Sequence, residues 1–342
     1  MKRIWPGFLL FLLVVTFPGH ALAADPVKLR MNSQFTATAA GSQIDQWFAE
    51  EVARATEGAV TIQIFWAGAL GAPKENLALL GAGAIDMAAM SPAYFPADLP
   101  FFSAPNSLPM TLGNLRQASE LMPRLLREVP AFRQEAERHG IRALFFHLLN
   151  PYLLMSREPI VKVADFKGKK IRTWGEDLPK LFQAVGAIPV NILIPEIYAS
   201  LQHGVVDAIP FNVDLAVTYK TFEVARHVSE VVIWMGPAWG VWINESAWQK
   251  ITPEHQARIL RVVDQARARE LETTAAAEKT ARQQLLATGV QFHAFPDAEL
   301  QRWQAAAPDF YADWIARMAA QGKEEDARKT VEILQQVRQE FQ

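Results

Sequence analysis

Residues 165–214, DFKGKKIRTWGEDLPKLFQAVGAIPVNILIPEIYASLQHGVVDAIPFNVD, decide the fold. Short segments at 169–172, 189–192 and 205–209 predict strands, and the residues between them, 178–185 and 195–204, have the apolar spacing of helices. Gly186 is placed to end the first helix and Pro195 to begin the second. The order strand, helix, strand, helix, strand predicts parallel strands joined by crossover helices, and hence an α/β fold.

Arg172 is the strongest candidate ligand-binding residue. Parallel sheets bind ligands just beyond the carboxyl ends of their strands, and Arg172 comes at the end of the first predicted strand. Its guanidinium offers a planar fork of donors that matches a carboxylate with two hydrogen bonds. A structural salt bridge is the commoner role of an arginine, but this position favours a ligand contact.

The stretch resembles the extracytoplasmic solute receptors of TRAP transporters, the DctP-type family. The resemblance rests on Lys167-Gly168, Ile171-Arg172, VGAIPV at 185–190 and EIYASLQHGVVD at 196–207. It implies a bilobed periplasmic-binding-protein-like fold, in which two βαβ lobes meet at a hinge and a long helix braces both. It also implies that a small organic acid binds between the lobes, with its carboxylate on Arg172, and is delivered unchanged to integral-membrane permease subunits.

Residues 1–23 are expected to be a cleaved secretory signal, which makes the protein periplasmic. Two basic residues precede the apolar run 8–15, and Ala21-Leu22-Ala23 is a small-x-small cleavage site. A retained membrane anchor is the alternative, but the run is shorter than the roughly 20 residues that a spanning helix needs. With no cysteine in the chain, neither a disulfide nor a lipid anchor is expected.

The charge of the mature chain argues against a nucleic-acid partner. The whole chain has 34 basic and 36 acidic residues, and the signal removes two basic ones, so the net charge is 32 − 36 = −4. A nucleic-acid-binding domain is usually basic.

The first lobe is predicted to repeat the pattern of the second. Strands at 27–31, 60–66 and 84–90 alternate with helices at 43–56 and 75–80. The sequence LLGAGAID at 79–86 resembles SLQHGVVD at 200–207, which suggests that the two halves are related. Asp86 and Asp207 are expected to hydrogen-bond turns at the strand starts rather than to contact a ligand.

The chain is predicted to cross between lobes twice. Asn150-Pro151 ends an apolar strand at 143–149, and Gly236-Pro237 separates strands at 231–235 and 239–244. Two crossings make a hinge about which the lobes can close on a ligand. The predicted first lobe contains residues 24–149 and about 237–279, and the second contains 150–236 and about 280–342. Residues 94–109, rich in proline and phenylalanine, are predicted to form a loop beside the cleft.

A long helix is predicted from Thr252 to about Thr288. Thr252 is a suitable N-cap, Pro253 suits the first turn, and Gly289 ends the run. About 35 helical residues would extend about 50 Å, which is longer than one lobe. A brace across both lobes is favoured over a coiled-coil dimer because the helix lacks a continuous apolar seam. We therefore expect a monomer.

The sequence contains no enzyme signature that we recognise. There is no GxGxxG before a helix, no P-loop, no HExxH and no GxSxG. The seven histidines lack zinc-ligand spacing, so no metal or other cofactor is expected. His147, within an apolar strand, is expected to be a core histidine with its hydrogen bonds satisfied. A periplasmic enzyme or a sensor-linked binding protein on the same fold is the alternative function.

Further residues are candidates for the walls of the cleft. Trp174 follows Arg172 closely, although packing at the lobe surface is an equal alternative for it. The others flank the second crossing or lie in first-lobe loops: Trp234, Trp239, Tyr94 and Gln34.

Two departures from the family pattern favour a monocarboxylate ligand. Phe211 stands where many members have a carboxylate-binding asparagine, and Asn212 comes one residue later. Tyr152 stands where some members have a second arginine. One cation and more aromatic surface suit a single carboxylate with an apolar or hydroxylated body. Asp214 is a candidate acceptor for a ligand hydroxyl or ammonium group, or a simple helix-start aspartate.

Overall fold

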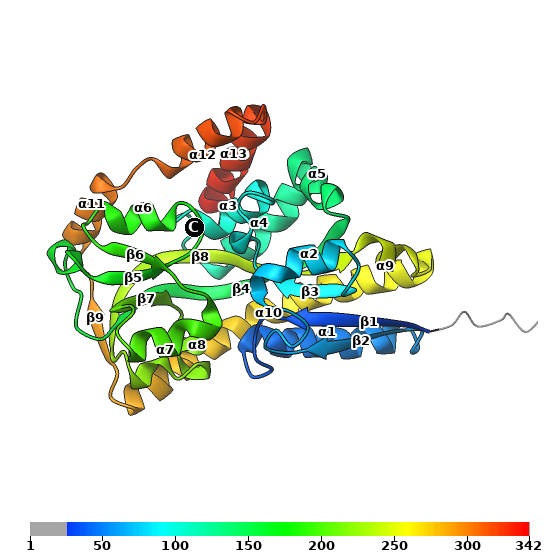
Figure 1. Cartoon of the computed structure of the whole chain (residues 1–342), viewed down its shortest axis with the longest axis horizontal. Coiled ribbons are helices and arrows are strands. Elements are labelled where there is room, and N and C mark those ends of the chain that lie inside the picture. The colour runs from blue at the N-terminus through cyan, green and yellow to red at the C-terminus, as the bar shows by residue number, and fades with distance from the viewer. Residues whose placement is uncertain (1–25, 342) are drawn as a thin grey trace, which may run out of the picture.

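Two long antiparallel strands, β4 (Ile141–Ser156) and β8 (His227–Asn244), run through both halves of the molecule (Figure 1). The computed structural model describes residues 26–341. Its strands form one sheet in the order β2-β1-β3-β8-β4-β7-β5-β6, and β9 pairs with the first residues of β8, on the same edge as β3 but at the opposite end of the strand. The expected signal peptide lies outside the described residues.

The first lobe is built on one end of β4 and β8. Strands β1 (Val27–Ser33), β2 (Val60–Phe65) and β3 (Met87–Met90) are parallel to one another, and β3 pairs antiparallel with β8. Helices α1 (Ala40–Ala55) and α2 (Asn76–Gly81) connect them. The predicted βαβαβ unit is therefore present.

The second lobe is built on the other end of the same two strands. Its strands are β5 (Lys170–Thr173), β6 (Ile188–Asn191), β7 (Ala208–Phe211) and β9 (Gln291–Ala294). Figure 1 shows α6 (Leu178–Gln183) on one side of these strands and α7 (Ile197–Gln202) with α8 (Val213–Thr218) on the other. The pairing of β5 with β6 and with β7 is parallel, as the sequence predicts.

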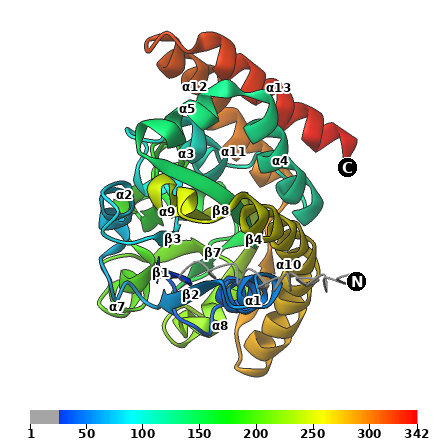
Figure 2. The same ribbon diagram turned by 90° about the vertical axis from the view of Figure 1, so that its right-hand side faces the viewer.

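The long helix α10 (Pro253–Ala287) braces both lobes. The Thr252 side chain accepts from the backbone N–H of His255 (3.3 Å), and Pro253 occupies the first turn. The helix contacts α1 in the first lobe, β4 at the crossing and α8 in the second lobe. Figure 2 shows α10 lying alongside α1. The predicted brace is confirmed. The shorter helix α9 (Glu245–Gln249) precedes it.

Residues 94–109 are not the predicted loop. They contain the end of a 3-10 turn (Pro92–Tyr94) and the helix α3 (Pro100–Ser107). Pro100 suits the first turn of this helix. The buried carboxylate of Glu135, on α5 (Pro130–Arg138), accepts the N–H groups of Phe101 (2.8 Å) and Phe102 (3.2 Å). The helix start is thus stabilised by a residue distant in sequence.

The proline pairs at the crossings do not end their strands. The pairing of β4 with β8 continues past Asn150-Pro151 and Gly236-Pro237, from Leu149↔Gly236 to Tyr152↔Trp234. Two residues of β4 lie between these pairs and only one of β8, so the register shifts there. The sequence signal marks a bulge rather than a break.

The C-terminal helices differ from the predicted division into lobes. Helix α11 (Asp297–Ala306) packs on the second lobe, where the Trp303 indole donates to the carbonyl of Leu181 (2.9 Å). Helices α12 (Phe310–Ala319) and α13 (Glu324–Glu340) instead pack with α3, α4 (Leu115–Glu128) and α5 in the first lobe's core. Nothing local in their sequence indicates which lobe they cover.

Within residues 26–341, no helix combines the length and the apolar character that crossing a bilayer requires.

Asp86 and Asp207 have the structural role expected of them. The carboxylate of Asp86 accepts the N–H of Arg30, and that of Asp207 accepts the N–H of Lys170, each at 2.8 Å. In both cases the aspartate N–H also donates back to the same residue's carbonyl. The two halves therefore use the same link between neighbouring parallel strands.

Asp207→Ala is expected to lower the free energy of unfolding by about 1–2 kcal/mol, because it leaves the Lys170 N–H without its charged acceptor. Asp86→Ala should have an effect of the same size, since its link is the same. Urea denaturation followed by circular dichroism measures both. The exposed Asp264→Ala is the control and should change stability by less than about 0.5 kcal/mol. Equal stability of all three variants would contradict the assignment.

Candidate ligand-binding site

A small cavity lies between the lobes, at the carboxyl ends of β1 and β3 on one side and of β5 on the other. Its volume is about 30 Å³. Seven of the ten residues predicted for the site line it: Gln34, Tyr94, Tyr152, Arg172, Trp174, Trp234 and Trp239. The lining also includes residues that the sequence did not single out: Phe35, Ser91, Asn106, Leu149, Ile194 and Ala238.

Arg172 is held in place by carbonyl groups that follow the neighbouring strands. Its Nε donates to the carbonyl of Ile192 (3.0 Å), just beyond β6, and its Nη1 donates to that of Pro210 (3.4 Å) in β7. The side chain is 2% exposed. Burial lowers the pKa of Arg172, and no carboxylate in the described part of the chain pairs with it.

Two aromatic residues lie against the guanidinium. Its central carbon is 4.7 Å from the ring centre of Trp174, so the ring face attracts the charge. The Tyr94 hydroxyl from the first lobe lies close enough to interact with it. Neither group carries a negative charge, so the cation remains without a counter-ion among residues 26–341.

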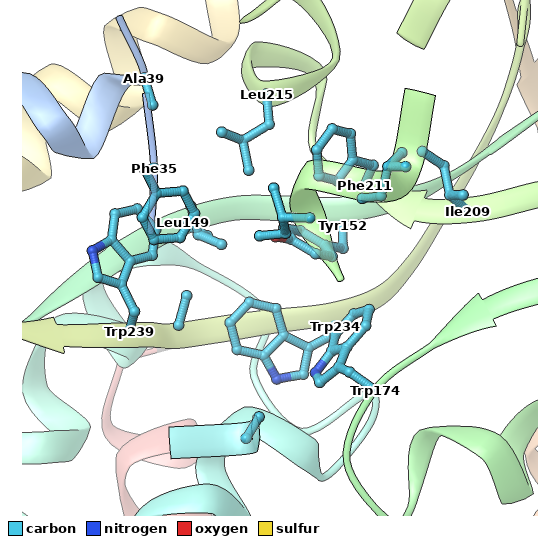
Figure 3. Packing of buried hydrophobic residues seen from close by; sticks show 14 of the residues in the cluster. Phe35, Ala39, Leu149, Tyr152, Trp174, Ile209, Phe211, Leu215, Trp234 and Trp239 are labelled. Carbon is cyan, nitrogen blue, oxygen red and sulfur yellow. The ribbon is translucent and has the colours of Figure 1, made fainter. Parts of the chain in front are cut away.

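An aromatic cluster forms one wall of the cavity, and Figure 3 shows Tyr152, Trp174 and Trp234 grouped together in it. The ring of Tyr152 meets those of Trp174 (5.4 Å) and Trp234 (5.3 Å) edge to face. Such pairs stabilise beyond the apolar area that they bury. The cluster gives the cavity rigid apolar faces.

The same two indoles join the lobes. Trp174 donates to the carbonyl of Asn106 (3.0 Å), and Trp234 donates to that of Pro105 (3.2 Å). Both carbonyls belong to the last turn of α3, where a helix has no internal donors to offer them. The lobe contact therefore also caps this helix.

The polar side chains that line the cavity from the first lobe are neutral, and most of them are already hydrogen-bonded to other groups of the protein. The amide of Asn106 donates to the carbonyls of Ala238 (2.6 Å) and Pro237 (3.2 Å), and the Ser91 hydroxyl donates to that of Ala238 (3.0 Å). Ser91 could have been predicted because it directly follows β3. No sequence signal identified Asn106, since its helix was read as a loop.

Three predicted site residues lie outside the cavity lining. Phe211 packs behind Tyr152 at 5.9 Å. The Asn212 side chain caps α8 by accepting the N–H of Leu215 (3.0 Å). The carboxylate of Asp214 accepts from the amide of Asn150 (2.9 Å), and burial raises its pKa to about 6. The last two help to hold α8 rather than to line the cavity.

The described residues hold no group of three or more His, Asp or Glu side chains suited to a metal ion.

Comparison with known families identifies the family of the chain. A sequence model of the bacterial extracellular solute-binding proteins of family 7, the DctP family, matches residues 36–317. The chain belongs to this family. A curated relative, the uncharacterised protein YiiZ of Salmonella typhimurium, is 24% identical over 227 residues. That match covers 64% of this receptor and 65% of YiiZ, so it spans slightly less than two thirds of the relative's length.

Solved TRAP periplasmic solute-binding proteins share the fold of this receptor. One from Desulfovibrio salexigens, with bound orotic acid, has a TM-score of 0.82 and 22% identity, covering 91% of this chain and 99% of that one. DctP7 of Bordetella pertussis, which binds pyroglutamic acid, has a TM-score of 0.79 and 19% identity over 90% and 99%. A third from Xanthobacter autotrophicus, with bound β-D-galacturonate, has a TM-score of 0.77 and 20% identity over 91% and 99%.

In the cavity wall, Trp239 packs against two rings. Phe35 lies 4.1 Å from it and His147 lies 4.4 Å from it in a stacked arrangement. His147 bonds to Glu270 on α10 through Nδ1 (2.6 Å) and to Asp45 on α1 through Nε2 (2.9 Å). The predicted core histidine is confirmed, and it links the brace to the wall of the cavity.

The His147 ring carries a positive charge. Burial alone would lower its pKa, but the charges of Glu270 and Asp45 and their hydrogen bonds outweigh this and raise the pKa to about 10. We assign the proton to His147 because two carboxylates contact it. The imidazolium is therefore part of the native structure at neutral pH.

The receptor is expected to lose stability as the pH rises from about 6.5 to about 10. Protonated His147 stabilises the folded state. This stabilisation is complete below the pKa of histidine in the unfolded chain, near 6.5, and is lost above the pKa of His147 in the folded chain, about 10. The free energy of unfolding should fall by up to about 1.4 kcal/mol per pH unit in this window. Urea denaturation at a series of pH values measures it.

Two variants serve as controls for this titration. His147→Gln should remove the His147 contribution to the slope, and Glu270→Gln should end the fall at a lower pH, because losing one of the two charges lowers the pKa of His147 in the folded state. Parallel curves for the receptor and for His147→Gln would exclude a charged His147.

Proposed function

We propose that this chain is a periplasmic receptor that binds a small organic monocarboxylate between its lobes and delivers it to the integral-membrane permease subunits of a TRAP transporter. The observation that carries the proposal is the Arg172 guanidinium, which is buried at the cavity with no carboxylate partner in residues 26–341. A buried charge is costly unless it is paired. A ligand carboxylate is the partner that suits its geometry.

A single carboxylate is supported by the charges at the cavity. Arg172 is the one charged side chain in the described lining. A second carboxylate would enter without a cation and would cost several kcal/mol of desolvation. Orotic acid, pyroglutamic acid and galacturonate, the ligands of the structural neighbours, each carry one carboxyl group. The aromatic wall formed by Tyr152, Trp174 and Trp234 would contact the ligand's body.

Delivery to a membrane permease and export to the periplasm rest on family membership and on the N-terminal sequence. The family consists of extracellular solute-binding proteins. Residues 1–23 have the pattern of a cleaved secretory signal. The chain would thus act as a receptor that releases its ligand unchanged.

Arg172→Ala is expected to weaken ligand binding by more than tenfold, because removing one partner of a buried charge pair costs about 2–5 kcal/mol. Arg172→Lys should bind with intermediate affinity, since it keeps the charge but not the fork of donors. Isothermal titration calorimetry measures the affinities, and circular dichroism verifies folding. The surface variant Arg282→Ala is the control. Near-native affinity of a folded Arg172→Ala would reject the assignment.

Small monocarboxylates are expected to raise the melting temperature more than dicarboxylates do. Pyroglutamate, orotate and branched or aromatic 2-oxo or 2-hydroxy acids would be compared with succinate, malate and fumarate in a thermal-shift panel. The monocarboxylates leave no charge unpaired and bury apolar surface worth about 25 cal/mol per Å². The largest shift coming from a C4-dicarboxylate would show that a further cation reaches the cleft.

A further inference from the structure

Gln34 carries a buried hydrogen-bond donor with no partner in the described protein. It follows β1 and is 3% exposed. Its Oε1 accepts the backbone N–H of Ser91 (3.3 Å), whereas its Nε2 has no acceptor within residues 26–341. The amide cannot be reversed without placing two donors against each other, because the Ser91 N–H can only donate. The orientation of the free donor is therefore determined.

This donor belongs to the same cavity as Arg172 but comes from the other lobe. Gln34 lines the cavity from the first lobe, and Arg172 lines it from the second. Among the other polar side chains that line it from the first lobe, Asn106 and Ser91 already donate to backbone carbonyls, and the Tyr94 hydroxyl lies against Arg172. The Trp239 nitrogen also lacks an acceptor in the described chain, but Figure 3 shows it pointing away from Trp234 and Trp174.

We propose that Gln34 Nε2 binds an acceptor oxygen of the ligand and makes the receptor selective for carboxylic acids with a separate carbonyl oxygen. The inference rests on the proposed function, because Arg172 holds the carboxylate. A ligand carbonyl, such as an oxo or lactam group, accepts a hydrogen bond and has no hydrogen to place against the N–H donors around it. If a ligand lacks this oxygen, the buried donor stays unpaired when the lobes close on it. An unpaired buried donor costs free energy, so such a ligand would bind much more weakly.

The test compares matched pairs of acids that differ only in the carbonyl group. 3-Oxocyclopentanecarboxylate is paired with cyclopentanecarboxylate, and 4-methyl-2-oxopentanoate is paired with 4-methylpentanoate. Calorimetry or thermal shift on the mature receptor gives the affinity ratio of each pair. The carbonyl-bearing acid is expected to bind at least about tenfold more tightly in one pair or more. Equal binding within every pair would overturn the proposal.

Two variants of Gln34 separate the donor from its structural contact with Ser91. Gln34→Glu keeps an oxygen for the Ser91 N–H and removes the donor, whereas Gln34→Met removes both. Both variants should lose the preference for the carbonyl-bearing acid, so that the affinity ratio falls towards one. A ratio that survives in both folded variants would overturn the role of Gln34.

The arginine variants distinguish this inference from the proposed function. Arg172→Lys should weaken both members of a pair by a similar factor and leave their ratio unchanged. If Arg172 variants abolish binding while Gln34 variants leave the ratio intact, the carboxylate receptor stands and the Gln34 inference fails. If no carboxylic acid in the panel binds the receptor, the proposed function fails and the inference fails with it.

Discussion

The pairing of β4 with β8 is the constraint on which the rest of the structure depends. Each strand contributes one end to the first lobe and the other end to the second, so neither lobe's sheet is complete without both. The register shift beside Leu149 and Tyr152 lies in the part of β4 that lines the cavity, and Trp234, Ala238 and Trp239 line it from β8. The floor of the cavity therefore coincides with the predicted hinge, and any closing motion about it would act on the residues that line the cavity.

The two lobes contribute different chemistry to the cavity. The second lobe supplies the charge, because Arg172 projects from a central parallel strand and is oriented by the carbonyls of Ile192 and Pro210. The first lobe supplies neutral groups that are mostly bonded to backbone, which makes its surface rigid. In the proposed function, the charge in one lobe would bind the ligand's carboxylate, and the fixed neutral groups of the other would select among ligands when the lobes close.

The parts of the structure that local sequence determines were predictable, and those that depend on distant contacts were not. Residues 165–214 carry their own caps and turn glycines, so their strands, their helices and the position of Arg172 followed from the pattern. Helix α3 was missed because Glu135 stabilises its start from another helix, and Asn106 was missed with it. Asn212 was placed in the site by alignment, yet its local role as an N-cap of α8 determines where it points.

The bonds from Trp174 and Trp234 to the last turn of α3 have a consequence for the time that a ligand stays bound. They join protein to protein and involve no ligand atom. If a ligand occupies the cavity as proposed and leaves by opening of the lobes, both indoles would have to release the helix first, so this step would add a common barrier to every dissociation. Weakly and tightly bound ligands would then differ in residence time by less than their contacts with the cavity suggest. A permease that pulls α3 away from the two indoles would accelerate the release of every ligand.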